Sequence, residues 1–313
     1  MPHKLMRMRR AESLRPAMLA IAGDSAAGKT TITRGLTEAL GADRSTAVCV
    51  DDYHRYDREE RGGLPLTPLH PACNHVQIME QHLQLLAMGQ PILKPVYDHR
   101  DGSLVRPRLV EPRDLVIVEG LLPLHTKLAR ACFDVTVYLD PPEPIRREWK
   151  ITRDIRQRGY TREQVLTELA RREADSAAFV RPQQREADIV VRFERIEGRE
   201  NRSLSATLLL RPTIRHPNFA QILSRATTSA VHLKLTRDSD GGPVDALHIH
   251  GYADPLEADV VAKAIWHDLG VPEPLPVCLG LMEDGSRNEP LRITQLILLH
   301  HLIRAGVWRL PDE

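Results

Sequence analysis

Residues 23–30 read Gly-Asp-Ser-Ala-Ala-Gly-Lys-Thr, and their types and spacing are suited to binding phosphate. Two glycines with four residues between them, followed by Lys-Thr, match the phosphate-binding loop pattern at every fixed position. Glycine lets the backbone approach a phosphate closely, and inward-pointing N–H groups favour an anion. Lys29 would place a positive charge on the terminal phosphates, and the Thr30 hydroxyl would ligate Mg²⁺. The predicted nucleotide site comprises Gly23, Asp24, Ser25, Ala26, Ala27, Gly28, Lys29, Thr30 and Thr31.

The segments that flank this loop favour the phosphate site over a chance match in a turn. Residues 17–22 form an apolar run that predicts a buried parallel strand. Residues 31–40 predict a helix, with Ile32, Leu36 and Leu40 on one stripe and Gly41 at its end. Strand, glycine loop and helix are the context that the motif requires.

A second cluster of polar residues follows the next predicted strand, residues 46–50. In an open parallel sheet, residues just past the carboxyl end of a strand lie in the ligand crevice. Asp51 or Asp52 could accept a hydroxyl proton there or help to hold the metal. If the segment is helical, His54 and Arg58 would share a face with Asp51 and could bind an anionic acceptor. The alternative is an exposed charged loop.

Two further strands end near residues that could complete a site. Residues 115–120 form an apolar strand that ends in Glu119, the position of a second carboxylate that orients Mg²⁺. Residues 91–99 predict a short strand before a turn at 101–102. Tyr97 and His99 would point to the same side of it and could line an acceptor pocket, although an ordinary hairpin explains them equally well.

A strongly basic segment, residues 141–158, follows a predicted strand at 134–140. A solvated basic face is one explanation. Because the segment follows the carboxyl end of a strand, it could instead form a lid whose arginines neutralise charge during phosphoryl transfer. A helix is expected over 161–174, with Thr161 as its N-cap and Gln164 three residues later. The basic residues are Arg146, Arg147, Lys150, Arg153, Arg156 and Arg158.

Composition restricts the classes of protein. The 313 residues include 43 basic and 42 acidic side chains, which argues against nucleic acid or a membrane surface as the main partner. Four cysteines without metal-type spacing indicate a reduced cytoplasmic protein. The expected fold is an α/β P-loop NTPase-type domain with a mainly parallel sheet flanked by helices. We expect a basic leader at 1–16, the core at 17–195, and an α+β extension with antiparallel strands at 196–313. The histidine pairs 248/250 and 300/301 are interpreted as ordinary residues and not as metal ligands.

These motifs together resemble the phosphoribulokinase branch of the phosphoribulokinase/uridine kinase family, over roughly residues 17–193. The similarity lies in the nucleotide loop, the acceptor-side motif, a following loop, two strand ends and the basic lid. The matching segments are 24–30, 51–54 with Arg58, Pro71 with Asn74, 94–99, 118–121, 150–154 and 158–160.

The resemblance implies ATP-dependent phosphorylation of D-ribulose 5-phosphate at O1, giving ribulose 1,5-bisphosphate for Calvin cycle-type carbon fixation. It implies ATP and Mg²⁺ as cofactors and Asp51 as the base, since bacterial relatives keep the first aspartate and not the second. Roles in catalysis would fall to Asp51, Lys29, Arg153 and Asp154, and Mg²⁺ would be held by Thr30, Glu119 and Asp51. The sugar phosphate would be bound by His54, Arg58, Tyr97, His99, Lys150 and Arg158.

The sequence also departs from the family. Plant-type relatives form a regulatory disulfide between the nucleotide loop and a cysteine just before the paired aspartates. Here Cys49 occupies the second position but Ala27 the first, so that disulfide cannot form. A homo-oligomer is expected from the family and from the apolar helix at 293–303.

Three alternatives stay open. The first is uridine kinase, which usually has Asp-Ser-Phe-Tyr where this chain has Asp-Asp-Tyr-His. The second is a kinase for another phosphorylated sugar or sugar acid. The third is a nucleotide-binding scaffold without catalysis, against which the presence of Lys29, Asp51 and Glu119 argues.

Overall fold

The computed structural model describes residues 15–195, 204–225 and 228–307. Contacts divide the described chain into two compact units. The N-terminal unit comprises residues 15–29 and 46–187, and the C-terminal unit comprises 30–45 with the described residues from 188 onward. The predicted leader, 1–16, lies largely outside the described residues. The nearly all-charged stretch 194–202 predicts a linker or exposed turn, and it too lies largely outside them. The predicted domain boundary at residue 195 stays a prediction.

The N-terminal unit is built on parallel strands in the order β2-β5-β1-β6. β1 pairs in parallel with both β5 and β6, and every residue of β1 is buried. A continuous apolar run is what a parallel strand covered on both faces requires, so the strand predictions for this unit are confirmed. The strands are β1 (Ala17–Gly23), β2 (Ser45–Cys49), β5 (Leu115–Gly120) and β6 (Val135–Leu139).

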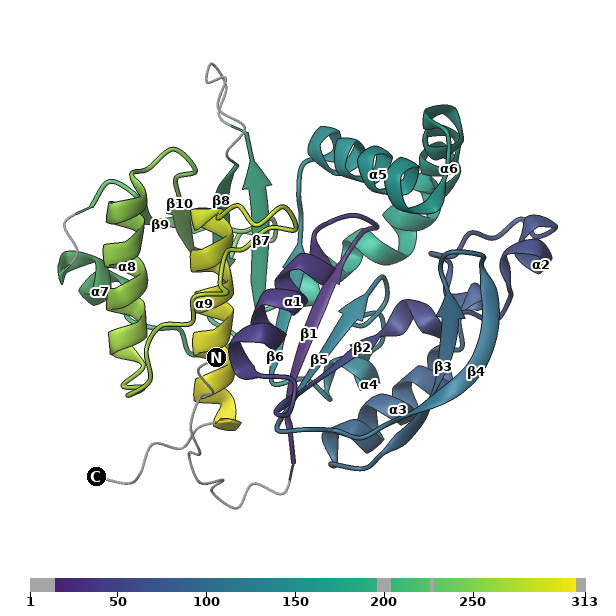
Figure 1. The fold of residues 1–313 in the computed structure, drawn as a ribbon, viewed down its shortest axis with the longest axis horizontal. Helices are drawn as coiled ribbons and strands as arrows, with labels where there is room; N and C mark the ends of the chain where they lie inside the picture. Colours follow the sequence, from purple (N-terminus) through teal and green to yellow (C-terminus); the bar gives the residue numbers. More distant parts are fainter. Residues whose placement is uncertain (1–14, 196–203, 226–227, 308–313) are drawn as a thin grey trace. The chain divides into compact units, whose positions relative to one another are not determined.

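One layer of this unit consists of α3 (Val76–Ala87) and the hairpin of β3 (Ile92–Asp98) and β4 (Ser103–Val110), which lies beside it (Figure 1). α3 buries Met79, Leu83 and Leu86 in a cluster with residues of β1, β2 and β5. The apolar residues at 76, 79, 83 and 86 predict a helix over 76–88, and this helix and the turn at 101–102 are both confirmed. The glycines at 62–63 and the prolines at 65, 68 and 71 predict a loop over 59–74. That prediction is wrong in part, because a capping box starts the short helix α2 (Arg58–Gly62).

The basic segment forms α5 (Glu143–Arg158), which lies against α6 (Arg162–Asp175) (Figure 1). Gly159 ends α5 with φ +69°, a left-handed conformation that glycine adopts at little cost. Thr161 and Gln164 form the predicted capping box of α6. The remaining helical pieces are η1 (Val50–Tyr53), η2 (Pro71–Cys73), α4 (Lys127–Arg130), η3 (Ser176–Val180) and η4 (Arg181–Glu186).

The C-terminal unit has the antiparallel order β7-β8-β10-β9, as predicted for the extension. Helix α9 is buried almost along its whole length, so its apolar residues are covered within the chain. The elements are β7 (Ile189–Glu194), β8 (Ser205–Leu210), α7 (Phe219–Arg225), β9 (Val231–Arg237), β10 (Pro243–Ile249), α8 (Pro255–Asp268), α9 (Glu289–Leu302) and η5 (Ile303–Val307).

Among the helices of residues 15–195, 204–225 and 228–307, none has both the length and the apolar composition needed to span a membrane.

A buried glutamine fastens α9 to the helix that follows the glycine loop, α1 (Lys29–Leu40). The Gln295 side chain donates to the Thr31 carbonyl oxygen at 3.1 Å and accepts from the Gly280 N–H at 2.8 Å. It passes so close to Gly35 that a Cβ there would lie 2.1 Å from Gln295 Nε2. Glycine at position 35 is therefore required by the close approach of the two helices.

We predict that Gly35→Ala destabilises the protein. Replacing a glycine inside a helix by alanine stabilises the helix by up to about 1 kcal/mol. Overpacking costs about 1–3 kcal/mol, and displacing Gln295 adds the loss of its two hydrogen bonds. The unfolding free energy from urea titration should fall by about 1–3 kcal/mol. The control is Gly62→Ala, where an added Cβ meets no atom within 4 Å. Equal stabilities for the two variants would contradict the packing argument.

Candidate active site

The glycine loop has the backbone geometry of an anion cradle. Gly23 (φ +153°), Ala26 (φ +64°) and Gly28 (φ +96°) all have positive φ. For alanine the left-handed conformation costs about 1–2 kcal/mol, and such strain concentrates at functional sites. A Cβ on Gly28 would meet no atom within 4 Å, so this residue leaves open space where α1 begins. Successive N–H groups at a helix start are suited to phosphate oxygens.

The predicted phosphate-binding lysine is held over this loop. Lys29 is buried, and its Nζ donates to the carbonyl oxygens of Gly23 and Asp24, both at 2.9 Å. An ammonium group has three donors, so two of them fix the side chain and the third can bind a ligand. Thr30 and Thr31 follow Lys29 in α1, and their predicted contacts with Mg²⁺ and nucleotide stay predictions.

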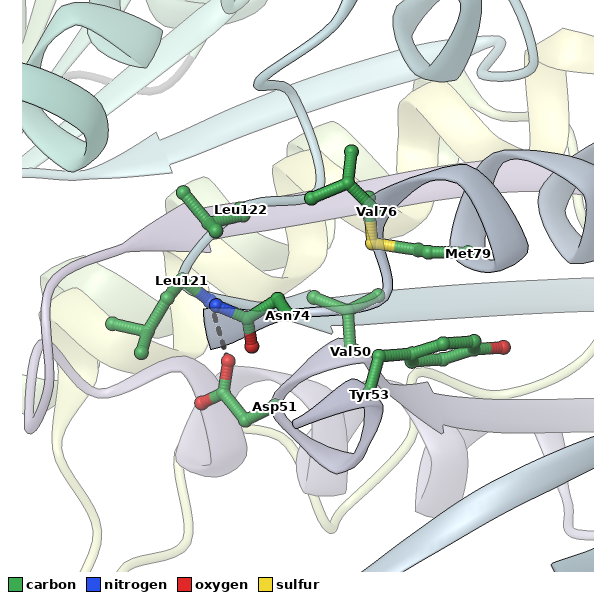
Figure 2. A pocket seen from close by; sticks show the side chains of 8 residues that line it. All are labelled: Val50, Asp51, Tyr53, Asn74, Val76, Met79, Leu121 and Leu122. Atoms are coloured by element: carbon green, nitrogen blue, oxygen red, sulfur yellow. Dashed lines mark hydrogen bonds between the residues drawn. The ribbon is translucent and has the colours of Figure 1, made fainter. Parts of the chain in front are cut away.

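Asp51 and Glu119 come together at the carboxyl ends of β2 and β5. Glu119 is in register with Ile21 of β1, two residues before Gly23. Asp51 Oδ1 accepts the Leu121 N–H at 2.8 Å, the bond drawn in Figure 2, and a Cβ on Gly120 would lie 2.8 Å from the same oxygen. Asp51 also lines a small pocket with Asn74 and apolar side chains (Figure 2). The predicted base therefore lies next to the strand end that carries the predicted metal ligand.

The neighbouring Asp52 binds two residues of the β3–β4 hairpin through its carboxylate. Its carboxylate pairs with the buried ammonium of Lys94 and accepts the Tyr97 N–H at 3.2 Å. Lys94 Nζ also donates to the Pro95 carbonyl oxygen at 3.1 Å. The two aspartates thus differ: Asp52 fastens β3 to the strand end, and Asp51 Oδ1 faces a backbone amide.

Burial and the negative charges of Asp51, Glu119 and Asp52 raise the pKa of the Cys49 thiol well above its usual range. The carboxylates therefore surround Cys49 closely enough to disfavour its thiolate. Cys49 is a free thiol, and Ala27 in the loop is buried.

The predicted acceptor residues form a ring cluster beside Asp51. Tyr97 lies edge-on to His54, with ring centroids 4.8 Å apart, and to His99, at 5.0 Å. Burial lowers the pKa of His99, opposed by the nearby charge of Asp51 and reinforced by Arg158 and Arg153. The charges of the predicted base and of two arginines of α5 therefore both act on the His99 ring.

Two further residues position this cluster. Buried Arg61 donates to the Tyr97 hydroxyl at 2.9 Å, with its guanidinium 5.5 Å from that ring centroid. Arg58 donates to the carbonyl oxygen of His99 at 3.0 Å and lies 5.9 Å from the Tyr160 ring. The structure thus brings Arg58, His99 and the lid together, and shows Tyr97 with its hydroxyl already bound.

The lid helix α5 contacts the glycine loop at two points. Arg146 lies 3.4 Å from Asp24 Oδ1 and donates to the Ser25 carbonyl oxygen at 3.3 Å. Arg153 donates to Ser25 Oγ at 3.2 Å. Asp24 is also bound by the Ser176 hydroxyl at 2.5 Å. Two guanidinium groups therefore stand at the edge of the phosphate cradle.

Asp154 is buried within a cluster of cations. It pairs with Lys150 at 2.6 Å, Arg153 at 2.8 Å and Arg158 at 3.5 Å. Burial raises the pKa of Asp154, but these cations outweigh it and hold the pKa below its usual value. Burial, and then Arg172, lower the pKa of Lys150 to about 8. One carboxylate thus organises three cations, and Lys150 points inward to it.

Three residues of the site could not be identified from the sequence as parts of it: Arg61, Ser176 and, in its contact with His54, Asn74. Arg61 lies in the stretch for which the sequence predicts a loop, and Ser176 belongs to no motif. Asn74 carried a signal, because it fell in a segment similar to the family's loop.

The oxygen donors present fit Mg²⁺, which prefers carboxylate, hydroxyl and phosphate oxygens. Glu119 and Asp51 lie at the ends of the neighbouring strands β5 and β2, and the negative charge of each raises the pKa of the Cys49 thiol. A group of three metal-ligating side chains does not occur in the described part of the chain.

We predict that Asp52→Asn is strongly destabilising, because it leaves the Lys94 ammonium buried without a counter-charge. The side chains are 14% and 5% exposed, and breaking such a pair costs about 3–5 kcal/mol. Urea unfolding measures the effect. The control is Asp98→Asn, whose partner Arg100 is 87% exposed and whose loss should leave stability unchanged. The double variant Asp52→Asn/Lys94→Met should recover most of the loss; failure to recover would contradict the ion-pair explanation.

The sequence and fold match known proteins. Residues 18–197 match the phosphoribulokinase/uridine kinase family. Phosphoribulokinase of Synechocystis is 36% identical over 217 residues, covering 68% of this chain and 65% of that protein. Chloroplastic phosphoribulokinase of Spinacia oleracea is 31% identical, covering 56% and 48%. Uridine kinase of Geobacillus kaustophilus is 34% identical, covering 56% and 86%.

The matched part of the chain thus spans less than two thirds of the length of the Synechocystis and Spinacia phosphoribulokinases. A solved structure of phosphoribulokinase from Rhodobacter spheroides has a TM-score of 0.58 at 16% identity, covering 80% of this chain and 99% of that chain. At that identity the likeness shows the fold, an α/β P-loop kinase fold. With the family match extending over more than half of its residues, the chain belongs to the phosphoribulokinase/uridine kinase family.

Proposed function

We propose that this protein transfers the γ-phosphoryl group of ATP to O1 of D-ribulose 5-phosphate, with Mg²⁺ as cofactor. The observation that carries the proposal is the set of arginines near the acceptor cluster: Arg58 donates to the His99 carbonyl oxygen at 3.0 Å, and Arg153 donates to Ser25 Oγ of the loop at 3.2 Å. The charges of Asp51 and of two lid arginines also act on the His99 ring, so the site combines a carboxylate with cations. An acceptor with both a reacting hydroxyl and an anionic group fits it better than a neutral one.

Asp51 is the proposed base. Its Oδ1 accepts the Leu121 N–H, which fixes the carboxylate and leaves Oδ2 for the acceptor hydroxyl. The hydroxyl oxygen attacks the γ-phosphorus, the bond from phosphorus to the β–γ bridging oxygen breaks, and the hydroxyl proton passes to Asp51. ADP is the leaving group. Bound Mg²⁺, for which Glu119 and Thr30 are the proposed ligands, would neutralise the β- and γ-phosphate oxygens.

The lid supplies the remaining positive charge. Arg153 reaches Ser25 of the loop, and we propose that it stabilises the transferring phosphoryl group. Arg58 and Arg158 are proposed to bind the acceptor phosphate. Because Lys150 is held by Asp154 at 2.6 Å, we propose that these two residues act by positioning the arginines.

Uridine kinase is the second candidate, favoured by the Geobacillus relative of which the chain covers 86%. Its acceptor is a neutral nucleoside, for which two lid arginines beside the acceptor cluster have no evident use. The two candidates can be separated by one assay of ADP release with MgATP and a single acceptor at a time. Turnover with ribulose 5-phosphate and not with uridine is expected. Turnover with uridine alone would overturn the proposal, and ATP binding with no acceptor turned over would favour a binding role.

We predict that Asp51→Asn lowers kcat by about two to four orders of magnitude, the range for removing a general base, while ATP still binds. The amide cannot take the proton but can still accept the Leu121 N–H, so the fold should be retained. Turnover is measured with the preferred acceptor, and ATP affinity by calorimetry. The control Asp98→Asn lies at the end of β3, paired with exposed Arg100. A near-normal kcat in Asp51→Asn would remove the assignment of the base.

A further inference from the structure

His54 and Asn74 form a buried pair beside Asp51. His54 is 4% exposed and Asn74 is 7% exposed, and His54 Nδ1 lies 2.7 Å from Asn74 Oδ1. The two residues also form an isolated antiparallel bridge, so their backbones are held together. Asn74 lines the same pocket as Asp51 (Figure 2).

The orientation of the Asn74 amide follows from its other contacts. Its Nδ2 donates to the carbonyl oxygens of Pro68 and His70, each at 3.0 Å. Carbonyl oxygens only accept hydrogen bonds, so Nδ2 must face them and Oδ1 must face the imidazole. An amide oxygen also only accepts, and His54 Nδ1 must therefore carry the proton.

The second ring nitrogen is left with a lone pair. The pKa of His54 is lowered to about 4, mainly by burial. Arg61 and His99 contribute to the lowering, while Asp51 and the Asn74 bond oppose it. At neutral pH the ring is thus uncharged, with its single proton on Nδ1 and an acceptor at Nε2. Within the described residues Nε2 has no hydrogen-bond partner. The atom is also not fully buried, so solvent reaches it.

This arrangement distinguishes between the parts of an acceptor. A phosphate oxygen presents lone pairs, which repel the lone pair of Nε2, whereas a hydroxyl can donate to it. We propose that His54 Nε2 accepts a hydrogen bond from a non-reacting hydroxyl of the acceptor, and that Asn74 is the positioning residue that holds His54 in this tautomer. The inference rests on the proposed function. It assigns the acceptor phosphate to arginines and narrows the expected contact of His54 with the sugar phosphate to one hydroxyl.

The substrate arm of the test uses His54→Asn, whose shorter amide can still bond Asn74 but lacks an atom at the Nε2 position. With ribulose 5-phosphate, kcat/KM should fall about tenfold, the equivalent of one hydrogen bond. The same variant is assayed with 3-deoxy- and 4-deoxyribulose 5-phosphate. The loss should vanish for the analogue that lacks the bound hydroxyl. A loss that persists for both analogues would assign His54 to the phosphate and overturn the proposal.

The spectroscopic arm does not depend on turnover. Nitrogen-15 NMR of histidine-labelled protein, with His54→Asn to assign the signal, should show His54 neutral and protonated at Nδ1 from pH 6 to 8. Protonation at Nε2 at pH 7 would overturn the proposal. If ribulose 5-phosphate is not turned over, the proposed function fails, and this arm still decides the tautomer.

Asn74→Asp tests the positioning role. A carboxylate partner stabilises the charged ring and should raise the pKa of His54, so that Nε2 becomes protonated as the pH falls. KM for the acceptor should then rise with falling pH between 8 and 6, whereas the wild-type KM should stay constant. His125→Asn, beside Phe179, is the control and should behave as wild type. A constant KM in Asn74→Asp despite a raised His54 pKa would contradict the role.

Discussion

The site depends on how three carboxylates are kept close together at the strand ends. Asp51, Asp52 and Glu119 all act on the thiol of Cys49, so each also lies within range of the others' charge. Like charges at short range destabilise one another unless each has a counter-charge or a donor. Lys94 neutralises Asp52, and the Leu121 amide binds Asp51. One of the three carboxylates is therefore neutralised by a lysine and a second is bound by a backbone amide, which allows the strand ends to carry all three.

The opposite problem is solved on the lid. Lys150, Arg153 and Arg158 would repel one another on a single helix, and the buried Asp154 holds them in place. The cluster retains a net positive charge, and one of its members reaches Ser25 of the loop. Positive potential is thus carried to the phosphate cradle by a rigid helix and not by flexible side chains alone.

The sequence predicts the elements of this fold well and their contacts poorly. β1 and β5 are uniform apolar runs, and α3 has a clear stripe, so periodicity identifies them. Asp51 and Glu119 could be found because they end strands beside a recognisable loop. Which of the adjacent aspartates is free for chemistry depends on Lys94, 42 residues away from Asp52, and no local pattern encodes that pairing. Arg61 is missed for a related reason, since a charged residue in a short helix normally faces water and here bonds Tyr97.

The surroundings of Cys49 have a consequence for control. A thiol exchanges or oxidises through its thiolate, and the carboxylates around Cys49 suppress that form. Position 27 offers only a buried alanine methyl group as a neighbour in the loop. Thiol chemistry at Cys49 is therefore disfavoured, so the carboxylates at these strand ends also protect the neighbouring cysteine from oxidation and exchange.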